Sequence, residues 1–171
     1  MPAFHLFTAI AALALVPASA SVAPAKTGSN QERVRAEIMP LFRGMEAAAN
    51  IHDTDAHLAY YRRDPSLIFV ANGTVIRGWD NLVAQQRKWW PGGKIAPADE
   101  AHEPYRLIVG PVFQSLGPRL AMLTFVLDAR RVYPDRVTRR PLAISQLWEK
   151  RSDGWKIIYA HESSGAERAS N

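Results

Sequence analysis

The C-terminal stretch from Leu142 to Ser163 constrains the fold more than any other part of this chain. Its two halves each alternate apolar and polar residues, and Asp153-Gly154 between them is typical of a tight β-hairpin turn. We predict that Trp148 pairs with Trp155 across this hairpin. One face of the hairpin then carries Leu142, Ile144, Gln146, Trp148, Trp155, Ile157, Tyr159 and His161. We expect this mostly apolar face to be buried, so its three polar groups need partners or a ligand, which predicts a lined cavity.

Helical periodicity and turn residues predict the elements that precede this hairpin. A helix is expected over residues 31–50 with a kink or break at Pro40, and a shorter one over 54–61 with Asp53 or Thr54 as its cap. A hairpin turning at Asn72-Gly73 follows, and then a third helix over residues 81–90. Long strands are expected over residues 105–115, 120–132, 141–149 and 155–163.

The helices and strands are segregated along the chain, which indicates the α+β class rather than a parallel α/β sheet. We expect a curved antiparallel sheet wrapped around three helices from the N-terminal half, enclosing a conical pocket. One domain is expected over residues 31–165, because roughly 140 residues suit a single core. Residues 21–30 read as a flexible leader and residues 166–171 as a disordered tail.

The first 20 residues read as a secretory signal peptide. The apolar run from Leu6 to Val16 is too short to span a bilayer, and Ala18-Ser19-Ala20 has the small residues of a cleavage site. We therefore expect cleavage between Ala20 and Ser21, a periplasmic or secreted product, and no integral membrane association. An uncleaved N-terminal anchor is the alternative.

Composition excludes several classes of function. The chain has no cysteine, so thiol chemistry, disulfides and cysteine metal sites are excluded. The formal net charge is +5, and much of the excess is arginine between positions 130 and 140. We interpret that run as a solvated hairpin loop and expect no nucleic-acid partner, because charge runs are usually exposed and export argues against such a role. No glycine-rich phosphate loop or dinucleotide fingerprint is present, so no cofactor is expected.

Three segments resemble the NTF2-like superfamily, in particular its SnoaL-like branch. They are the hairpin from Phe69 to Trp79, the helical region ending at Asp53 with the apolar helix and Asp64-Pro65 after it, and the stretch from Leu147 to Ser163. Together they cover roughly residues 31–165. The resemblance implies the conical fold and a homodimer formed through the open sheet face. It does not choose among isomerases, dehydratases, cyclases and non-catalytic association domains, because fold alone does not determine function.

The candidate catalytic residues are His161, Asp128 and Tyr159. His161 would act as a general acid or base, because imidazole titrates near neutral pH. Asp128 interrupts an apolar strand and would act as a base if its burial raised its pKa. The alternatives are a buried, hydrogen-bonded His161 and an Asp128 paired with Arg130, and we favour the paired interpretation for Asp128.

The candidate pocket residues are Tyr61, Trp79, Trp89, Gln146, Trp148 and Ser163. Tyr61 or Tyr159 would polarise a carbonyl group. Neighbouring helix residues point about 100° apart, so we expect only one member of each pair Tyr60-Tyr61 and Trp89-Trp90 to face the pocket. His52 and His57 lie near two aspartates, but their spacing is poor for a metal site and helix capping explains the carboxylates, so no metal is expected.

These features favour an exported protein that binds a small, largely apolar organic ligand. If it is catalytic, we expect cofactor-free proton transfer of the isomerase, dehydratase or cyclase type. The alternatives are a non-catalytic ligand-binding protein and a dimeric association module.

Overall fold

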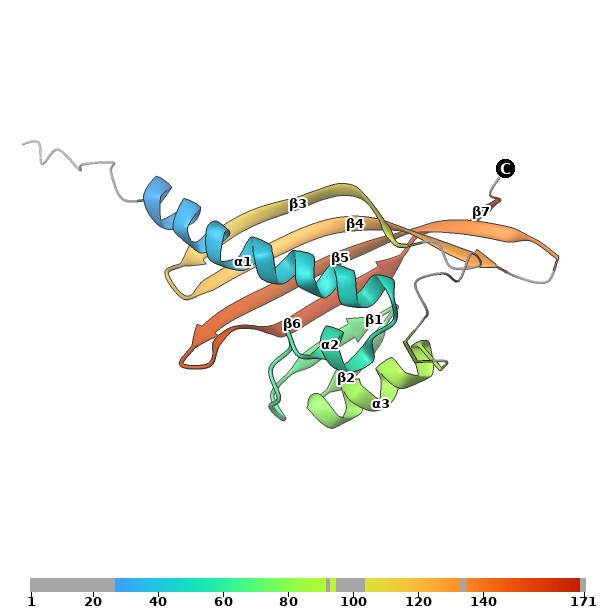
Figure 1. Ribbon diagram of the computed structural model, residues 1–171, viewed down its shortest axis with the longest axis horizontal. Helices are drawn as coiled ribbons and strands as arrows, with labels where there is room; N and C mark the ends of the chain where they lie inside the picture. The colour runs from blue at the N-terminus through green and yellow to red at the C-terminus, as the bar shows by residue number, and fades with distance from the viewer. Residues whose placement is uncertain (1–26, 92, 95–103, 133–134, 170–171) are drawn as a thin grey trace, which may run out of the picture.

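The chain folds into three helices and a curved, open sheet (Figure 1). The computed structural model describes residues 27–91, 93–94, 104–132 and 135–169, so the expected signal peptide lies outside the described residues. The elements are α1 (Thr27–Asn50), α2 (Thr54–Leu58), β1 (Ile68–Ala71), β2 (Thr74–Arg77), α3 (Trp79–Trp89), β3 (Arg106–Gly117), β4 (Leu120–Val132), β5 (Val137–Arg151), β6 (Gly154–Ser164) and β7 (Arg168–Ala169). This order and the α+β class agree with the sequence prediction.

The sheet is mixed rather than antiparallel throughout. Its strand order is β2-β1-β6-β5-β4-β3, and β7 pairs with β5 beside this path. β1 pairs with β6 in parallel, whereas the other pairs are antiparallel. The hairpin between β1 and β2 turns as predicted, with positive φ angles of 46° at Asn72 and 84° at Gly73.

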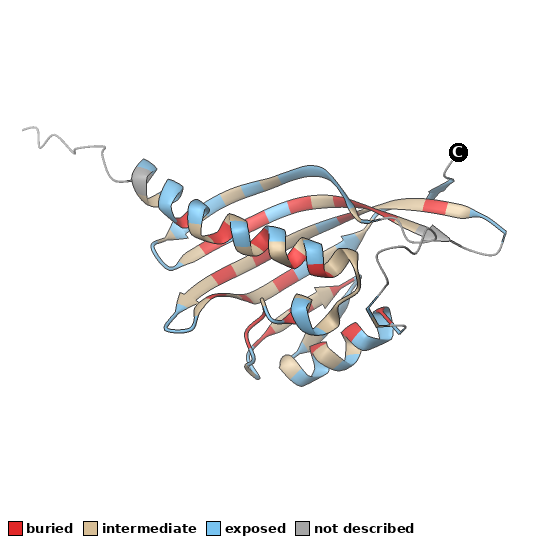
Figure 2. Ribbon diagram, viewed as in Figure 1, coloured by how far each residue is buried: buried red, intermediate tan, exposed pale blue. Residues whose placement is uncertain are grey.

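Helix α1 covers the concave face of the sheet with one apolar stripe (Figure 2). Val34, Ile38, Phe42 and Met45 are each no more than 3% exposed. The predicted break at Pro40 is absent, because the helix is continuous from Thr27 to Asn50. The buried side chains on both sides of Pro40 stabilise it more than one missing backbone hydrogen bond destabilises it. The helix also includes residues 27–30, which were expected to belong to the leader.

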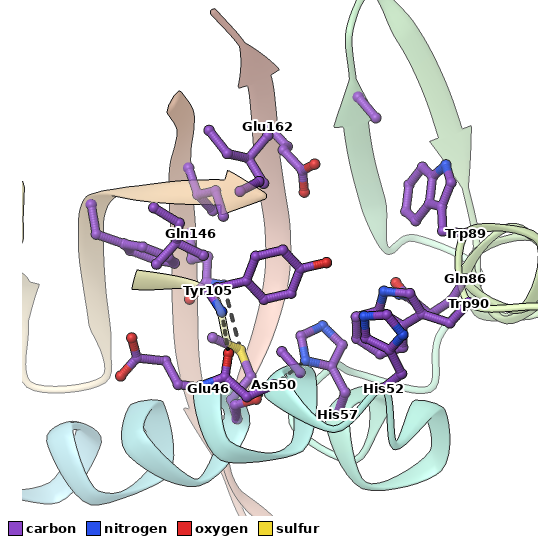
Figure 3. Close-up of a pocket in the computed structure, with 18 of the residues that line it drawn as sticks. Glu46, Asn50, His52, His57, Gln86, Trp89, Trp90, Tyr105, Gln146 and Glu162 are labelled. Atoms are coloured by element: carbon purple, nitrogen blue, oxygen red, sulfur yellow. Dashed lines mark hydrogen bonds between the residues drawn. The ribbon is translucent and has the colours of Figure 1, made fainter. Parts of the chain in front are cut away.

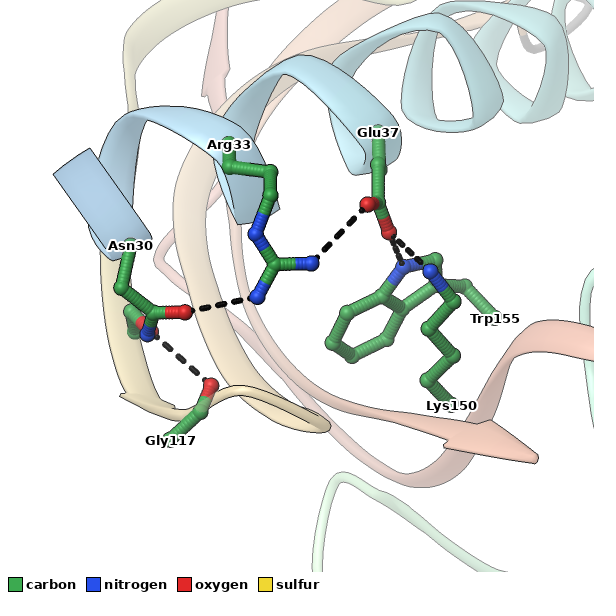
Figure 4. Close-up of polar contacts among 7 residues, drawn as sticks. Asn30, Arg33, Glu37, Gly117, Lys150 and Trp155 are labelled. Atoms are coloured by element: carbon green, nitrogen blue, oxygen red, sulfur yellow. Dashed lines mark hydrogen bonds and ion pairs between the residues drawn. The ribbon is translucent and has the colours of Figure 1, made fainter.

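A polar cluster fixes α1 over the hairpin formed by β5 and β6 (Figure 4). Glu37 Oε2 accepts hydrogen bonds from Lys150 Nζ at 2.5 Å and from Trp155 Nε1 at 2.7 Å. Glu37 Oε1 accepts one from Arg33 Nη1 at 3.3 Å. The hydrogen bonds from Lys150 and Trp155 lower the pKa of Glu37, so its carboxylate stays charged at neutral pH.

The register between β5 and β6 differs from the predicted one. Trp148 lies opposite Ile157 and Leu147 opposite Tyr159, so Ile158 is an extra residue in β6. Such a β-bulge reverses the alternation of side chains beyond it. Trp155 and Ile157 therefore face the core before the bulge, whereas Ala160 faces it afterwards and His161 is exposed on the outer face.

Part of the expected disordered tail forms a short strand. Arg168 and Ala169 pair with Arg139 and Thr138 of β5. No helix in the described part of the chain is long and apolar enough to cross a membrane.

Candidate functional site

A cavity of about 550 Å³ lies between the helices and the concave side of the sheet (Figure 3). This volume is in the range of small-molecule sites. Apolar side chains of β4 and β5 form much of its wall, including Phe125, Leu127, Leu142 and Ile144. Its polar lining consists of Glu46, Asn50, His52, His57, Tyr61, Asn72, Gln86, Tyr105, Arg130, Arg140, Gln146 and Glu162, together with the indoles of Trp89 and Trp90.

Tyr61 is held in the cavity wall directly beside the bulge of β6. The amide of Ile157 donates to the Tyr60 carbonyl at 2.8 Å, and the amide of Arg62 donates to the Ile157 carbonyl at 2.9 Å. These two backbone hydrogen bonds flank Tyr61, whose side chain is 4% exposed. Burial, and secondarily the negative charge of Glu162, raise the pKa of Tyr61 above its ordinary value. The phenol therefore keeps its proton and acts as a hydrogen-bond donor.

Gln146 orients this phenol from the neighbouring strand. Its side chain hydrogen-bonds Tyr61, and this contact partly opposes the rise in the pKa of Tyr61. The Gln146 amide is itself fixed, because its Oε1 accepts from Trp148 Nε1 at 3.2 Å and its Nε2 lies 3.5 Å from Met45 Sδ. Trp148 is fully buried and does not line the cavity, so it supports Gln146 from behind rather than contacting a ligand.

The side chain of Glu162, rather than that of His161 as predicted, lines the cavity from β6. The bulge at Ile158 turns Tyr159, His161 and Ser163 toward the outer face of β6 and turns Ala160 and Glu162 inward. The expectation that His161 and Tyr159 face the cavity is therefore wrong, and so is the placement of Ser163 in the pocket. Figure 3 shows Glu162 among the side chains around the cavity, on the opposite side from α1.

His57 supplies a neutral imidazole. It lines the cavity from α2, and its Nδ1 lies 3.4 Å from the Met45 carbonyl oxygen. Removal from water lowers the pKa of His57 to about 4, against the smaller opposite effect of the Met45 carbonyl. At neutral pH Nδ1 therefore carries the proton and donates to Met45, which leaves Nε2 as an acceptor.

Aromatic rings surround the other side of the cavity. His52 stacks on Trp90 with ring centroids 4.9 Å apart and an interplanar angle of 5°. Trp90 also meets His57 edge-on at 5.2 Å, and Tyr105 lies 6.3 Å from His52. Both Trp89 and Trp90 line the cavity, contrary to the expectation that only one would. Trp90 follows the last residue of α3, and its backbone leaves the helical conformation, so the helical spacing rule does not apply to it.

Two other predicted site residues lie elsewhere. Asp128 points away from the cavity and accepts hydrogen bonds from Arg139 Nη1 at 2.9 Å and Arg106 Nη2 at 3.2 Å. Asp128 is therefore ion-paired, but the partners that the structure gives are Arg139 and Arg106 rather than the expected Arg130. Trp79 lies in a separate surface depression, where the Arg63 guanidinium is 5.2 Å from its ring centroid.

Of the residues predicted for the pocket, the structure brings Tyr61, Gln146 and Trp89 together in the cavity. Sequence reasoning missed Glu162 because the alternation rule assigns it to the outer face. His52 and His57 were considered only as metal ligands, and the described residues contain no group of three or more side chains suited to a metal ion. Capping explains one nearby carboxylate, because Asp53 Oδ1 accepts from the Ala56 amide at 3.0 Å.

Comparisons with known proteins identify the fold. No family model and no curated protein matches the chain. Among solved structures, an NTF2-like protein of unknown function from Shewanella oneidensis is 25% identical with a TM-score of 0.61, and the match covers 76% of this chain and 98% of that one.

Two further similar structures come from proteins of different kinds. A ketosteroid isomerase-like protein from Erwinia carotovora atroseptica is 18% identical with a TM-score of 0.59, covering 77% of this chain and 95% of that one. The association domain of Caenorhabditis elegans CaMKII is 16% identical with a TM-score of 0.61, covering 79% of this chain and 98% of that one. At such identities the likeness concerns the fold alone. This chain therefore has the NTF2-like fold that its sequence resembles.

Proposed function

We propose that the cavity binds a small, largely apolar carbonyl compound and catalyses cofactor-free proton transfer on it. The observation that carries this proposal is the meeting of a protonated Tyr61 phenol and the Glu162 carboxylate in one cavity. A carboxylate accepts a proton and a buried phenol donates a hydrogen bond, which are the two roles that such a reaction requires. The apolar wall supplies the binding surface for the rest of the ligand.

In this mechanism the Glu162 carboxylate removes a proton from the carbon next to the carbonyl group. The electron pair of the C–H bond moves into a carbon–carbon double bond, and negative charge develops on the carbonyl oxygen. The Tyr61 O–H, oriented by Gln146, donates a hydrogen bond to that oxygen. If the substrate has a β,γ double bond, return of the proton from Glu162 to the γ-carbon completes an isomerisation. If it has a β-hydroxyl group, transfer of the same proton to that group lets it leave as water, which completes a dehydration and restores the carboxylate.

Deuterium exchange tests the elementary step without knowledge of the natural substrate. We expect wild-type protein in D₂O to incorporate deuterium at the α-carbons of cyclic ketones and enones, measured by proton NMR. Glu162→Gln should slow this exchange by roughly 100-fold or more, because general bases contribute about that much. Tyr61→Phe should slow it by a comparable factor, because it removes the donor to the developing oxyanion.

Glu167→Gln is the matched control, since it makes the same change at an exposed position. It should leave the exchange rate unchanged. His161→Gln should also leave it unchanged if Glu162 is the base. Exchange that survives Glu162→Gln but is lost in His161→Gln would contradict the proposed mechanism.

The neutral state of His57 gives a pH prediction. The folded-state pKa of about 4 lies below the ordinary imidazole pKa of about 6.5, so folding favours the neutral imidazole. The resulting stability is present above pH 6.5 and is lost as the pH falls toward 4; it amounts to at most about 3 kcal/mol. NMR titration of the His57 imidazole should give a midpoint near the lower value, with the signal assigned from His57→Gln. A midpoint near 6.5 would show that the imidazole is hydrated rather than enclosed.

Association is a second candidate function, favoured by a separate observation. Large apolar side chains are exposed on β3 and the adjoining part of β4: Leu107, Ile108, Val109, Val112, Leu116 and Met122. Such a surface is typical of a protein–protein contact. We propose that it forms a homodimer, which is compatible with a functional cavity on the other side of the sheet.

Sedimentation equilibrium tests this association. The wild-type chain should sediment as a dimer, and Val112→Lys should shift it toward monomer, because Val112 is a 61% exposed member of the apolar surface. Val75→Lys is the matched control, since Val75 is 52% exposed but lies on β2 at the opposite edge of the sheet. A wild-type monomer at all concentrations would exclude the dimer.

A further inference from the structure

We infer that the ligand carries an anionic group, and that Arg140 binds it at the end of the cavity away from Gln146. This inference deepens the proposed function and depends on it, because it assigns the substrate to the class of apolar organic acids. It is carried by the order of side chains along β5 and by the hydrogen-bonding state of Arg140.

Four alternate residues of β5 line the cavity. Gln146 lies beside Tyr61, Ile144 and Leu142 are apolar, and Arg140 ends the series. On the flanking strands Glu162 lies opposite Ile144, and Ala129 opposite Arg140. Four residues of strand separate the level of Glu162 from the level of Arg140, which corresponds to about 13 Å between backbone positions. An apolar body between these levels would contact Leu142 and Leu127, which pair with each other.

Arg140 has unused hydrogen-bonding capacity in this position. Its Nε atom is buried and has no hydrogen-bond partner in the described parts of the chain. Buried polar atoms are nearly always hydrogen-bonded in native proteins, so an orphaned donor in the cavity wall indicates a missing ligand group. A guanidinium favours an oxyanion that can accept two parallel hydrogen bonds.

The neighbouring arginines have other roles. Arg139 pairs with Asp128 on the outer face at 2.9 Å, and Arg136 pairs with Asp135 at 3.1 Å. Arg130 is also among the residues that line the cavity, next to Ala129, which pairs with Arg140. Among the acidic lining residues, burial raises the pKa of Glu46, which favours its neutral form despite the opposing charge of Arg43. The interpretation of this arginine run as a solvated loop therefore does not hold for Arg140.

A pair of fluorescent probes isolates the contribution of the anionic group. 8-Anilinonaphthalene-1-sulfonate and N-phenyl-1-naphthylamine share one aromatic body, but only the first carries a sulfonate. Fluorescence titration should show that the wild-type chain binds the sulfonate probe more tightly than the neutral one. Arg140→Gln should weaken sulfonate binding by about tenfold or more, as expected for loss of a charge-assisted hydrogen bond, and leave neutral-probe binding unchanged.

Arg136→Gln is the matched control, because it removes the same charge from an exposed position. It should change neither affinity, and thermal unfolding should verify that both variants fold. Sulfonate binding that is unaffected by Arg140→Gln, including binding to the apolar surface of β3, would overturn the inference. Equal weakening of both probes would overturn it too, while leaving the apolar cavity established. Failure of the wild-type chain to bind either probe would overturn the inference and the proposed function together.

Discussion

The bulge at Ile158 is the constraint on which the rest of the site depends. Without this residue, strand alternation would continue from Trp155 and Ile157 to Tyr159 and His161, and the cavity would contain an imidazole in place of a carboxylate. With it, Ala160 and Glu162 turn inward. Next to the bulge, Ile157 donates its amide hydrogen to the Tyr60 carbonyl and accepts a hydrogen bond from the Arg62 amide, and these two bonds hold Tyr61 against β6. One inserted residue thus places both the proposed base and the proposed hydrogen-bond donor.

The two ends of the sheet are packed differently. At one end α1 packs tightly against the hairpin of β5 and β6, and the cluster of Glu37, Lys150 and Trp155 ties them together. At the other end the helices leave space, and the cavity extends along β4 and β5 toward Arg130 and Arg140. None of the helices in the described residues covers the outer face of the sheet, and the exposed apolar side chains of β3 support the proposed association. A catalytic cavity and a dimer interface can therefore coexist in one small domain.

Local sequence signals predicted most of the elements. Asn72-Gly73 and Asp153-Gly154 both form the expected turns, and the apolar stripe of α1 faces the core. The errors arise where a single residue changes the local geometry. Nothing in Ile157-Ile158 distinguishes a bulge from a regular strand, because both residues suit either conformation. The helical spacing rule does not predict the direction of the Trp90 side chain, because α3 ends one residue earlier. The partners of Asp128 depend on which strands neighbour β4, which local sequence does not encode.

Cysteine accessibility is the most direct measurement of which side chains of β6 face the cavity after the bulge at Ile158. The native chain has no cysteine, so only the introduced thiol can be labelled. Single substitutions His161→Cys, Ser163→Cys, Ala160→Cys and Glu162→Cys would be treated with a bulky maleimide under native conditions. The account predicts fast labelling at positions 161 and 163 and slow labelling at 160 and 162. The opposite pattern, with slow labelling at 161 and fast labelling at 162, would show that β6 has no bulge and that His161 faces the cavity.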